Sequence, residues 1–200
     1  MYKRQDALRT KRDLLKEDIE KYLPDELENI GINVSKTDFE FINQGSYAIR
    51  TTIKNPYGSM DLDYAVIIPI DTDIHSNIPK IKKAVKNSLD HVSARTVKIK
   101  EPCVTVSYYE NNEETIHIDF PIYASDDYGI YLSRGKEFSS EDNYFWENAD
   151  PKGLNSYFND YLAGNDSLRK IIRLTKNGNR KNTKTVIMTM KFHQVLHLLY

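Results

Sequence analysis

Two aspartates, Asp61 and Asp63, open an apolar stretch that has the composition of a buried strand. Because side chains alternate between the two faces of a strand, these two carboxylates project from the same face. Carboxylates so close repel each other, and such a pair persists mainly where a cation neutralises it. The pattern therefore predicts a divalent-metal site at one end of a rigid strand.

A third acid, Asp119, lies in a later strand-like run (116–120) in which apolar and polar residues alternate. If this run pairs beside the strand of the aspartate pair, the three carboxylates can hold two Mg²⁺ or Mn²⁺ ions about 3.5–4 Å apart. One ion would lie with a triphosphate, and the other would lower the pKa of an attacking hydroxyl. Asp119 also has the chemistry of a general base for that hydroxyl. From the two strands alone, exposed charges at strand ends remain an alternative.

A glycine-serine turn precedes the aspartate pair by one loop. It comprises Gln44, Gly45, Ser46 and Tyr47. Glycine lets the backbone approach a phosphate, and adjacent N–H groups with the Ser46 hydroxyl can hold its oxygens. Glycine-serine alone is a weak signal, but with Asp-x-Asp and a later lone aspartate it becomes much more specific. Tyr47 and Arg50 are predicted to line the site, although Tyr47 could equally be a core residue.

The elements that would position these residues follow from periodicity and turn signals. Helical spacing predicts a surface helix from Asp6 to Leu23, ended by Pro24. Further helices are predicted over 77–92, 151–162 and 166–174. Strands are predicted over 38–42, 60–70, 103–109 and 115–123, the last two joined as a hairpin, with a turn at 43–46. A sheet followed by helices is typical of the α+β class.

Composition narrows the classes of protein. The chain has 200 residues, a net charge of -1 and 40% hydrophobic residues, which suit one or two domains with a real core. Near-neutral charge argues against a long nucleic acid as partner, because non-specific binding needs a basic face. No apolar run approaches the roughly 20 residues that span a bilayer, so we expect no membrane partner and a cytoplasmic location. Cys103, the only cysteine, is predicted to be a small core residue.

Two further groups of polar residues are not expected to form sites. His75, His91 and His117 are interpreted as structural or surface histidines rather than ligands. Asp71 and Asp73 form a second acid pair, but they follow a proline in a predicted loop, so they are interpreted as solvated charge.

The sequence resembles the polymerase-β-like nucleotidyltransferases, in particular the bacterial relatives of cyclic GMP-AMP synthase that make cyclic oligonucleotides in anti-phage systems. The resemblance rests on residues 44–48 (Gln-Gly-Ser-Tyr-Ala), 61–63 (Asp-Leu-Asp) and 117–123 (His-Ile-Asp-Phe-Pro-Ile-Tyr). It implies a polymerase-β-like sheet and a reaction that joins nucleoside triphosphates into a cyclic di- or trinucleotide with release of pyrophosphate. In that family a helical lobe supplies basic residues to the phosphates, which makes Lys170 and Arg173 candidates. A solvated helix face is an equal alternative for each.

The resemblance also implies a division of the chain near residue 135. Residues 1–135 would form the catalytic core with the N-terminal helix, and 136–200 a partial helical lobe. These relatives are longer, and they carry a Pro-Ser-Gly-Ile-Ala-like helix start where this chain has an atypical tail from about residue 176. We hypothesise that the tail is a frameshift product, because a shifted frame permits that motif over 192–197. The three acids could then be present in a protein with poor or absent turnover.

Two other functions remain open. The first is a nucleotidyltransferase that adds a nucleotide to RNA, a small molecule or a protein, although near-neutral charge weighs against a long RNA. The second is a non-catalytic nucleotide-binding module, which the atypical tail favours and the three acids oppose. The bases used, the linkage formed and the oligomeric state are not determined by the sequence.

Overall fold

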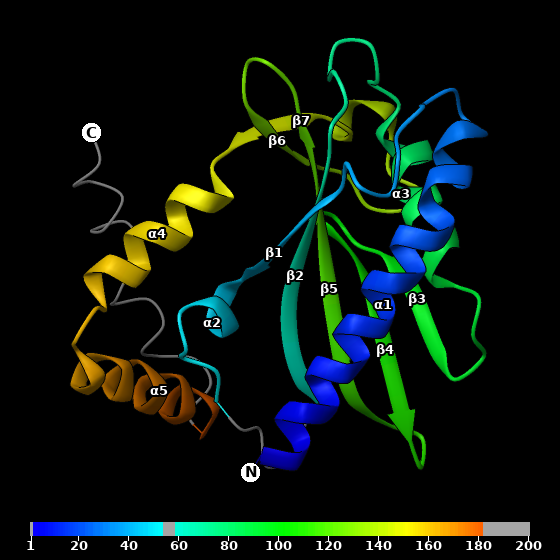
Figure 1. The fold of residues 1–200 in the computed structure, drawn as a ribbon. Coiled ribbons are helices and arrows are strands. Elements are labelled where there is room, and N and C mark those ends of the chain that lie inside the picture. Colours follow the sequence, from blue (N-terminus) through cyan, green and yellow to red (C-terminus); the bar gives the residue numbers. More distant parts are fainter. Residues whose placement is uncertain (1, 54–58, 182–200) are drawn as a thin grey trace.

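The fold is that of a computed structural model, which describes residues 2–53 and 59–181 (Figure 1). The strands are β1 (Glu40–Gln44), β2 (Met60–Ile68), β3 (Arg95–Ile99), β4 (Cys103–Glu110), β5 (Glu113–Ser125), β6 (Ile130–Ser133) and β7 (Trp146–Ala149). The helices are α1 (Tyr2–Glu28), α2 (Gly45–Ala48), α3 (Ile78–Leu89), α4 (Pro151–Tyr161) and α5 (Asp166–Lys181), with a short 3-10 turn, η1 (Glu141–Asn143). This mixture confirms the predicted α+β class.

The described strands form one sheet, in the order β1-β2-β5-β4-β3, with β6 paired to β5 and β7 to β6. β2 and β5 run parallel at its centre, and β1 is an edge strand antiparallel to β2. The predicted hairpin of β4 and β5 is confirmed. Its turn residues Asn111 and Asn112 both have positive φ (53° and 64°), the conformation that a tight two-residue hairpin turn requires and that asparagine tolerates.

Helices α1 and α3 contact each other and share one hydrophobic core with the sheet (Figure 1). The two helices contribute nine buried residues to this core: Leu8, Leu15, Ile19, Leu23, Leu27, Ile81, Ala84, Val85 and Leu89. Alternate residues of the central strands complete this core: Leu62, Tyr64, Val66 and Ile68 from β2, and Ile116, Ile118, Phe120 and Ile122 from β5. Burying one such aliphatic side chain contributes roughly 1.5–3 kcal/mol, so this core holds the two central strands in place.

The opposite face of the sheet carries polar residues at its centre. Because strand side chains alternate, the residues between the buried ones on β2 and β5 point away from α1 and α3. They include Asp61 and Asp63 on β2, and His117 and Asp119 on β5. The predicted alternation along 116–120 is thus confirmed. Together with the alternation along β2, it places all four side chains on one face.

Two local predictions are wrong. α1 does not end at Pro24 but continues to Glu28, because burial of Leu27 stabilises a last turn that outweighs the hydrogen bond lost at the proline. Residues 43–46 are not one turn. The first two of them end β1, and the last two begin the short helix α2. The other predicted elements are confirmed, with ends that differ by a few residues, except that α5 continues to Lys181 and not only to residue 174.

The segment after β5 returns toward the edge strand β1. β7 lies beyond residue 135 and pairs with β6, so the sheet continues into the segment predicted as the helical lobe. α4 begins at an Asp150 cap, whose carboxylate accepts the Gly153 N–H at 2.7 Å, and α5 follows beside the α2 end of β1 (Figure 1). The two-domain division stays a prediction, and the tail over 182–200 lies outside the described residues. None of the helices in the described part of the chain has the length and apolarity to cross a bilayer.

Candidate active site

The parallel pairing of β2 with β5 brings the three acids together. Asp63 lies opposite Asp119, and Asp61 lies opposite His117 in the register. One donor atom each of Asp61, His117 and Asp119 lies within 4.8 Å of the others, which is close enough for a shared metal ion. Asp63 is adjacent to this set, since both other aspartates act on its charge. The structure thus places all three predicted acids at one point of the sheet.

The electrostatics of Asp63 are those of a carboxylate held among like charges. Burial, and then the charges of Asp61 and Asp119, raise the pKa of Asp63 to about 6. His117 and Lys176 act in the opposite direction without cancelling this rise. A divalent cation would remove the repulsion, and carboxylate oxygens are the ligands that Mg²⁺ and Mn²⁺ prefer. The side chains present therefore fit the predicted divalent ions.

His117 belongs to this cluster, although sequence reasoning assigned it to structure or surface. Its Nε2 lies 3.0 Å from Asp61 Oδ1, and its Nδ1 lies 3.1 Å from Glu114 Oε1. The hydrogen bond to Asp61 raises the pKa of His117 to about 9, against the opposite effect of burial. A signal for this position was available, because His117 stands two residues before Asp119 and so shares its strand face.

Asp119 is held by two residues that no sequence motif marks. The hydroxyl of Thr105, on β4, donates to Asp119 Oδ1. The Lys100 ammonium lies 3.7 Å from the same oxygen. Thr105 is buried and lies opposite Asp119 in the β4–β5 register. These contacts hold one carboxylate oxygen of Asp119 and thereby fix the direction in which the other oxygen points.

The glycine-serine turn lies directly beside the acids, because Gln44 pairs with Asp63 across β1 and β2. Gly45 has a φ of 57°, and a Cβ at this position would overlap the carboxylate of Asp63. Only glycine satisfies both the left-handed backbone and the close approach. The Ser46 hydroxyl lies 3.4 Å from the Thr52 hydroxyl. The Gln44 amide donates to the Tyr123 hydroxyl at 3.0 Å.

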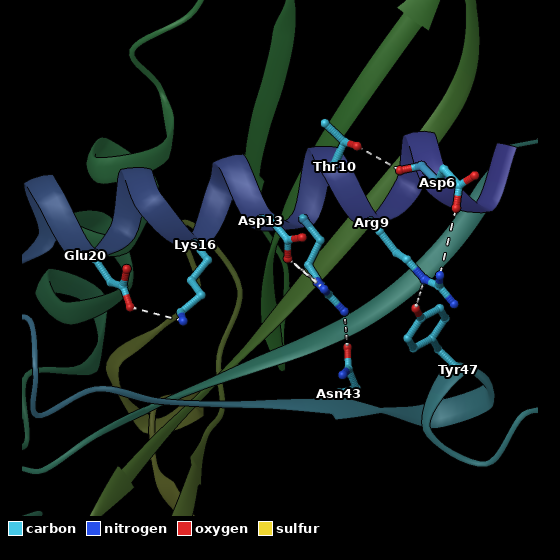
Figure 2. A network of polar contacts seen from close by, with 9 residues as sticks. Asp6, Arg9, Thr10, Asp13, Lys16, Glu20, Asn43 and Tyr47 are labelled. Carbon is cyan, nitrogen blue, oxygen red and sulfur yellow. Dashed lines mark hydrogen bonds and ion pairs between the residues drawn. The ribbon is translucent and has the colours of Figure 1, made fainter. Parts of the chain in front are cut away.

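Helix α1 contacts the segment that contains this turn (Figure 2). Nε of Arg9 donates to the Tyr47 hydroxyl at 2.9 Å, and Nη1 of Arg12 donates to Asn43 Oδ1 at 3.2 Å. Tyr47 packs against the edge of the main core while its hydroxyl meets Arg9. Tyr47 therefore links α1 to α2. Neither of the two alternatives left open by the sequence, a residue lining the site or a core residue, describes this role fully.

Basic residues of α5 lie at the loop that follows the turn. Nη1 of Arg173 donates to the carbonyl oxygen of Arg50 at 2.8 Å. Lys176, one helical turn later, donates to the Thr51 hydroxyl at 3.4 Å. Lys170 is exposed one turn earlier on the same helix. The structure thus places Arg173 beside this loop, together with Lys176, which sequence reasoning did not single out. A role for Arg173 and Lys170 in binding phosphate stays a prediction.

Two side chains set aside by the sequence behave as expected. Asp71 Oδ1 accepts the backbone N–H groups of Asp73 and Ile74 at 2.8 and 3.2 Å, so this acid shapes a loop. Cys103 is buried, and burial raises the pKa of its thiol to about 12. A thiol that stays protonated at neutral pH is not a nucleophile.

Comparison with known families places the site residues inside a recognised domain. Residues 39–123 match the family model described as the nucleotidyltransferase domain of cyclic GMP-AMP synthase DncV-like proteins. This range contains the glycine-serine turn and all three aspartates, so the resemblance expected from the sequence is confirmed for this domain. Among curated protein sequences, none matches the chain.

Solved structures of Vibrio cholerae DncV share the fold. DncV, a cyclic AMP-GMP synthase and prokaryotic cGAS homolog, has a TM-score of 0.63 at 18% identity, over 88% of this chain and 61% of that chain. Its complex with the linear intermediate 5' pppA(3',5')pG has a TM-score of 0.64 at 16% identity, over 88% and 62%. The GTP-bound form has 0.63 at 19% identity, over 88% and 60%. The chain spans about three fifths of the length of these structures.

Proposed function

We propose that this chain, whose residues 39–123 match the DncV-like nucleotidyltransferase domain, transfers nucleotides from nucleoside triphosphates to make a cyclic di- or trinucleotide. The observation that carries the proposal is the strand register, which sets Asp63 opposite Asp119 and next to the glycine-serine turn. DncV binds GTP and a linear dinucleotide intermediate, which supports nucleoside triphosphates as substrates here. A cytoplasmic location and a role in defence against phage stay predictions.

Each site residue has a distinct role in this proposal. Asp61, Asp63 and Asp119 would hold two Mg²⁺ or Mn²⁺ ions. When bound, such ions stabilise the charge on the phosphates and lower the pKa of the attacking hydroxyl. The backbone at Gly45 and the hydroxyl of Ser46 would hold phosphate oxygens. Asp119, oriented by Thr105 of β4 and by Lys100, would accept the proton of the attacking hydroxyl.

The basic residues at the end of α5 would complete the phosphate site. Arg173 already contacts the loop after the glycine-serine turn, and Lys176 contacts the same loop. An arginine or lysine near a triphosphate adds charge-assisted hydrogen bonds. Lys170 is proposed only as a more distant contributor, because it lies one turn farther from this loop.

The test is a transfer assay with the purified chain. Each nucleoside triphosphate is incubated with Mg²⁺ or Mn²⁺, with and without an acceptor, and pyrophosphate and nucleotide products are measured. Cyclic product without an acceptor supports the proposal, whereas transfer only in the presence of RNA, a small molecule or a protein selects the alternative enzyme. Asp63→Asn should abolish pyrophosphate release, while the control Asp73→Asn, in the exposed second acid pair, should not. Full activity in Asp63→Asn would contradict the proposal.

A second candidate is nucleotide binding without turnover. It is favoured by apolar side chains on α4 and α5 that are 42–69% exposed: Leu154, Tyr157, Tyr161, Ile171 and Leu174. Surfaces of this kind bind a partner or further chain. With these apolar side chains uncovered, the segment that contains α4 and α5 would bind a triphosphate without closing over it. Calorimetric binding of a non-hydrolysable triphosphate, together with no pyrophosphate release from the natural one, would select this candidate.

A further inference from the structure

The residues around Asp61 suggest how this exposed carboxylate is kept ready for a metal ion. We propose that His117 is a positioning residue that orients Asp61, and that Glu114 and Ser59 orient His117 in turn. This inference rests on the function proposed above, since it assigns a metal-binding role to Asp61. It concerns the residues that hydrogen-bond behind the carboxylates rather than the carboxylates themselves.

Asp61 needs such support more than Asp119 does. Its side chain is 56% exposed, whereas that of Asp119 is 20% exposed. An exposed carboxylate at the start of a strand loses side-chain freedom when it binds an ion, which weakens binding unless its orientation is already set. The hydrogen bond from His117 Nε2 to Asp61 Oδ1, 3.0 Å long, provides that orientation.

His117 itself is held from both central strands. Glu114 lies three residues earlier on β5, and its Oε1 is 3.1 Å from His117 Nδ1. Ser59 precedes β2, and its hydroxyl is also 3.1 Å from Nδ1. With the hydrogen of Nε2 donated to Asp61, Nδ1 accepts from the Ser59 hydroxyl in the neutral ring and donates to the carboxylate of Glu114 in the protonated ring, so the ring is fixed in both protonation states. Groups that hydrogen-bond to a metal-binding carboxylate commonly strengthen metal binding.

The rival arrangement is direct coordination by His117, because its donor atom lies within 4.8 Å of those of Asp61 and Asp119. The hydrogen-bond geometry favours the outer position. An Nε2 that donates its hydrogen to Asp61 has no lone pair left for a metal. The two arrangements predict different spectra, because only direct coordination brings a nitrogen into the first shell of the ion.

The experiment measures Mn²⁺ binding to the metal-free full chain by electron paramagnetic resonance, independently of catalysis. His117→Leu should weaken Mn²⁺ affinity by about 10–100-fold. His117→Gln, whose side-chain amide can donate near the position of Nε2, should restore affinity to within a few-fold of the wild type. His91→Leu is the matched control, because His91 is an exposed histidine that contacts the Tyr22 ring of α1, and it should bind like the wild type.

Each outcome separates this inference from the proposed function. Equal affinity in His117→Leu and wild type would overturn the positioning role and leave the function intact. A directly coordinated nitrogen in the spin-echo spectrum of bound Mn²⁺ would do the same. If His117→Leu does not fold, His117→Gln decides, because a loss of affinity as large as in Asp63→Asn overturns the role. Absence of Mn²⁺ binding that depends on Asp63 in the wild type would instead overturn the proposed function.

Discussion

Arg9 in the first turns of α1 donates a hydrogen bond to Tyr47, 2.9 Å away, and so connects that helix to the short helix that begins at Gly45. Arg12 makes a parallel contact with Asn43, at the end of edge strand β1 (Figure 2). α1 packs on the face of the sheet opposite the acids. These two arginines therefore reach around the edge of the sheet and brace the segment that carries the phosphate-binding turn.

Replacing Arg9 by leucine should weaken substrate binding more than it destabilises the fold. Because Arg9 is exposed, loss of its hydrogen bond should leave the thermal stability almost unchanged. The turn should become less well positioned, so we expect a several-fold rise in KM for the triphosphate with little change in kcat. Tyr47→Phe should reproduce this rise. Lys16→Leu, a charge loss on the same helix, is the control, and an unchanged KM in Arg9→Leu would show that the brace has no functional role.

Gly45→Ala should damage both the fold and nucleotide binding. The left-handed backbone costs an alanine roughly 1–2 kcal/mol, and its Cβ would displace the carboxylate of Asp63. Gly31→Ala separates the two effects, because Gly31 also has a positive φ (83°) but open space around it. We expect Gly31→Ala to lose only the stability that the left-handed backbone costs, and Gly45→Ala to lose at least as much thermal stability together with triphosphate affinity measured by calorimetry. Equal nucleotide affinity in the two variants would contradict the assigned contact.

Asp63→Asn should stabilise the metal-free protein while it removes activity. The raised pKa of Asp63, about 6, reports burial and repulsion by two neighbouring aspartates. Removing its charge should raise the free energy of unfolding at pH 7 by about 1–2 kcal/mol, allowing for partial exposure. Thermal unfolding in EDTA checks this. Added Mg²⁺ should then stabilise the wild type more than the variant, and a variant less stable than the wild type in EDTA would count against a destabilising effect of the buried, repelled charge.

Lys82 provides a prediction that concerns folding alone. Its side chain is fully buried, and its ammonium donates to the backbone carbonyls of Lys100, Glu101 and Gly135. Lys82→Met would leave these carbonyls without that donor. We expect a loss of about 2 kcal/mol in the free energy of unfolding at pH 7, measured by urea denaturation. Lys83→Met, at the next and exposed position of α3, should have little effect.

The same residue should make stability depend on pH in the alkaline range. Burial lowers the pKa of Lys82 from 10.5 to about 8, so between these pH values the unfolded chain binds more protons than the folded protein. The contribution of Lys82 to stability therefore rises with pH in this window. The gap in unfolding free energy between wild type and Lys82→Met should widen by about 2–3 kcal/mol from pH 8 to pH 10.5. A gap that stays constant would contradict the lowered pKa.

Local sequence patterns predicted much of the candidate site. Asp61 and Asp63 could be placed on one face from their spacing, because strand alternation is a property of the backbone itself. The conformational freedom of Gly45 is likewise local, and the structure places this glycine where a turn against a carboxylate needs it. The helix end predicted at Pro24 is wrong because it depends on contacts that are not local. Burial of Leu27 against distant residues decides how far α1 runs.

The sequence by itself determined the chemical types, the strand faces and most of the elements, although not β3, β6 and β7. Each of these features depends on residues within a few positions of one another. The tertiary structure decided which faces meet. Thr105 and His117 join the acids only through the register of three strands, and Arg173 reaches Arg50 only because α5 lies beside that loop. Contacts between residues far apart in the chain leave no local periodicity, since they are set by how buried surfaces of separate elements pack together.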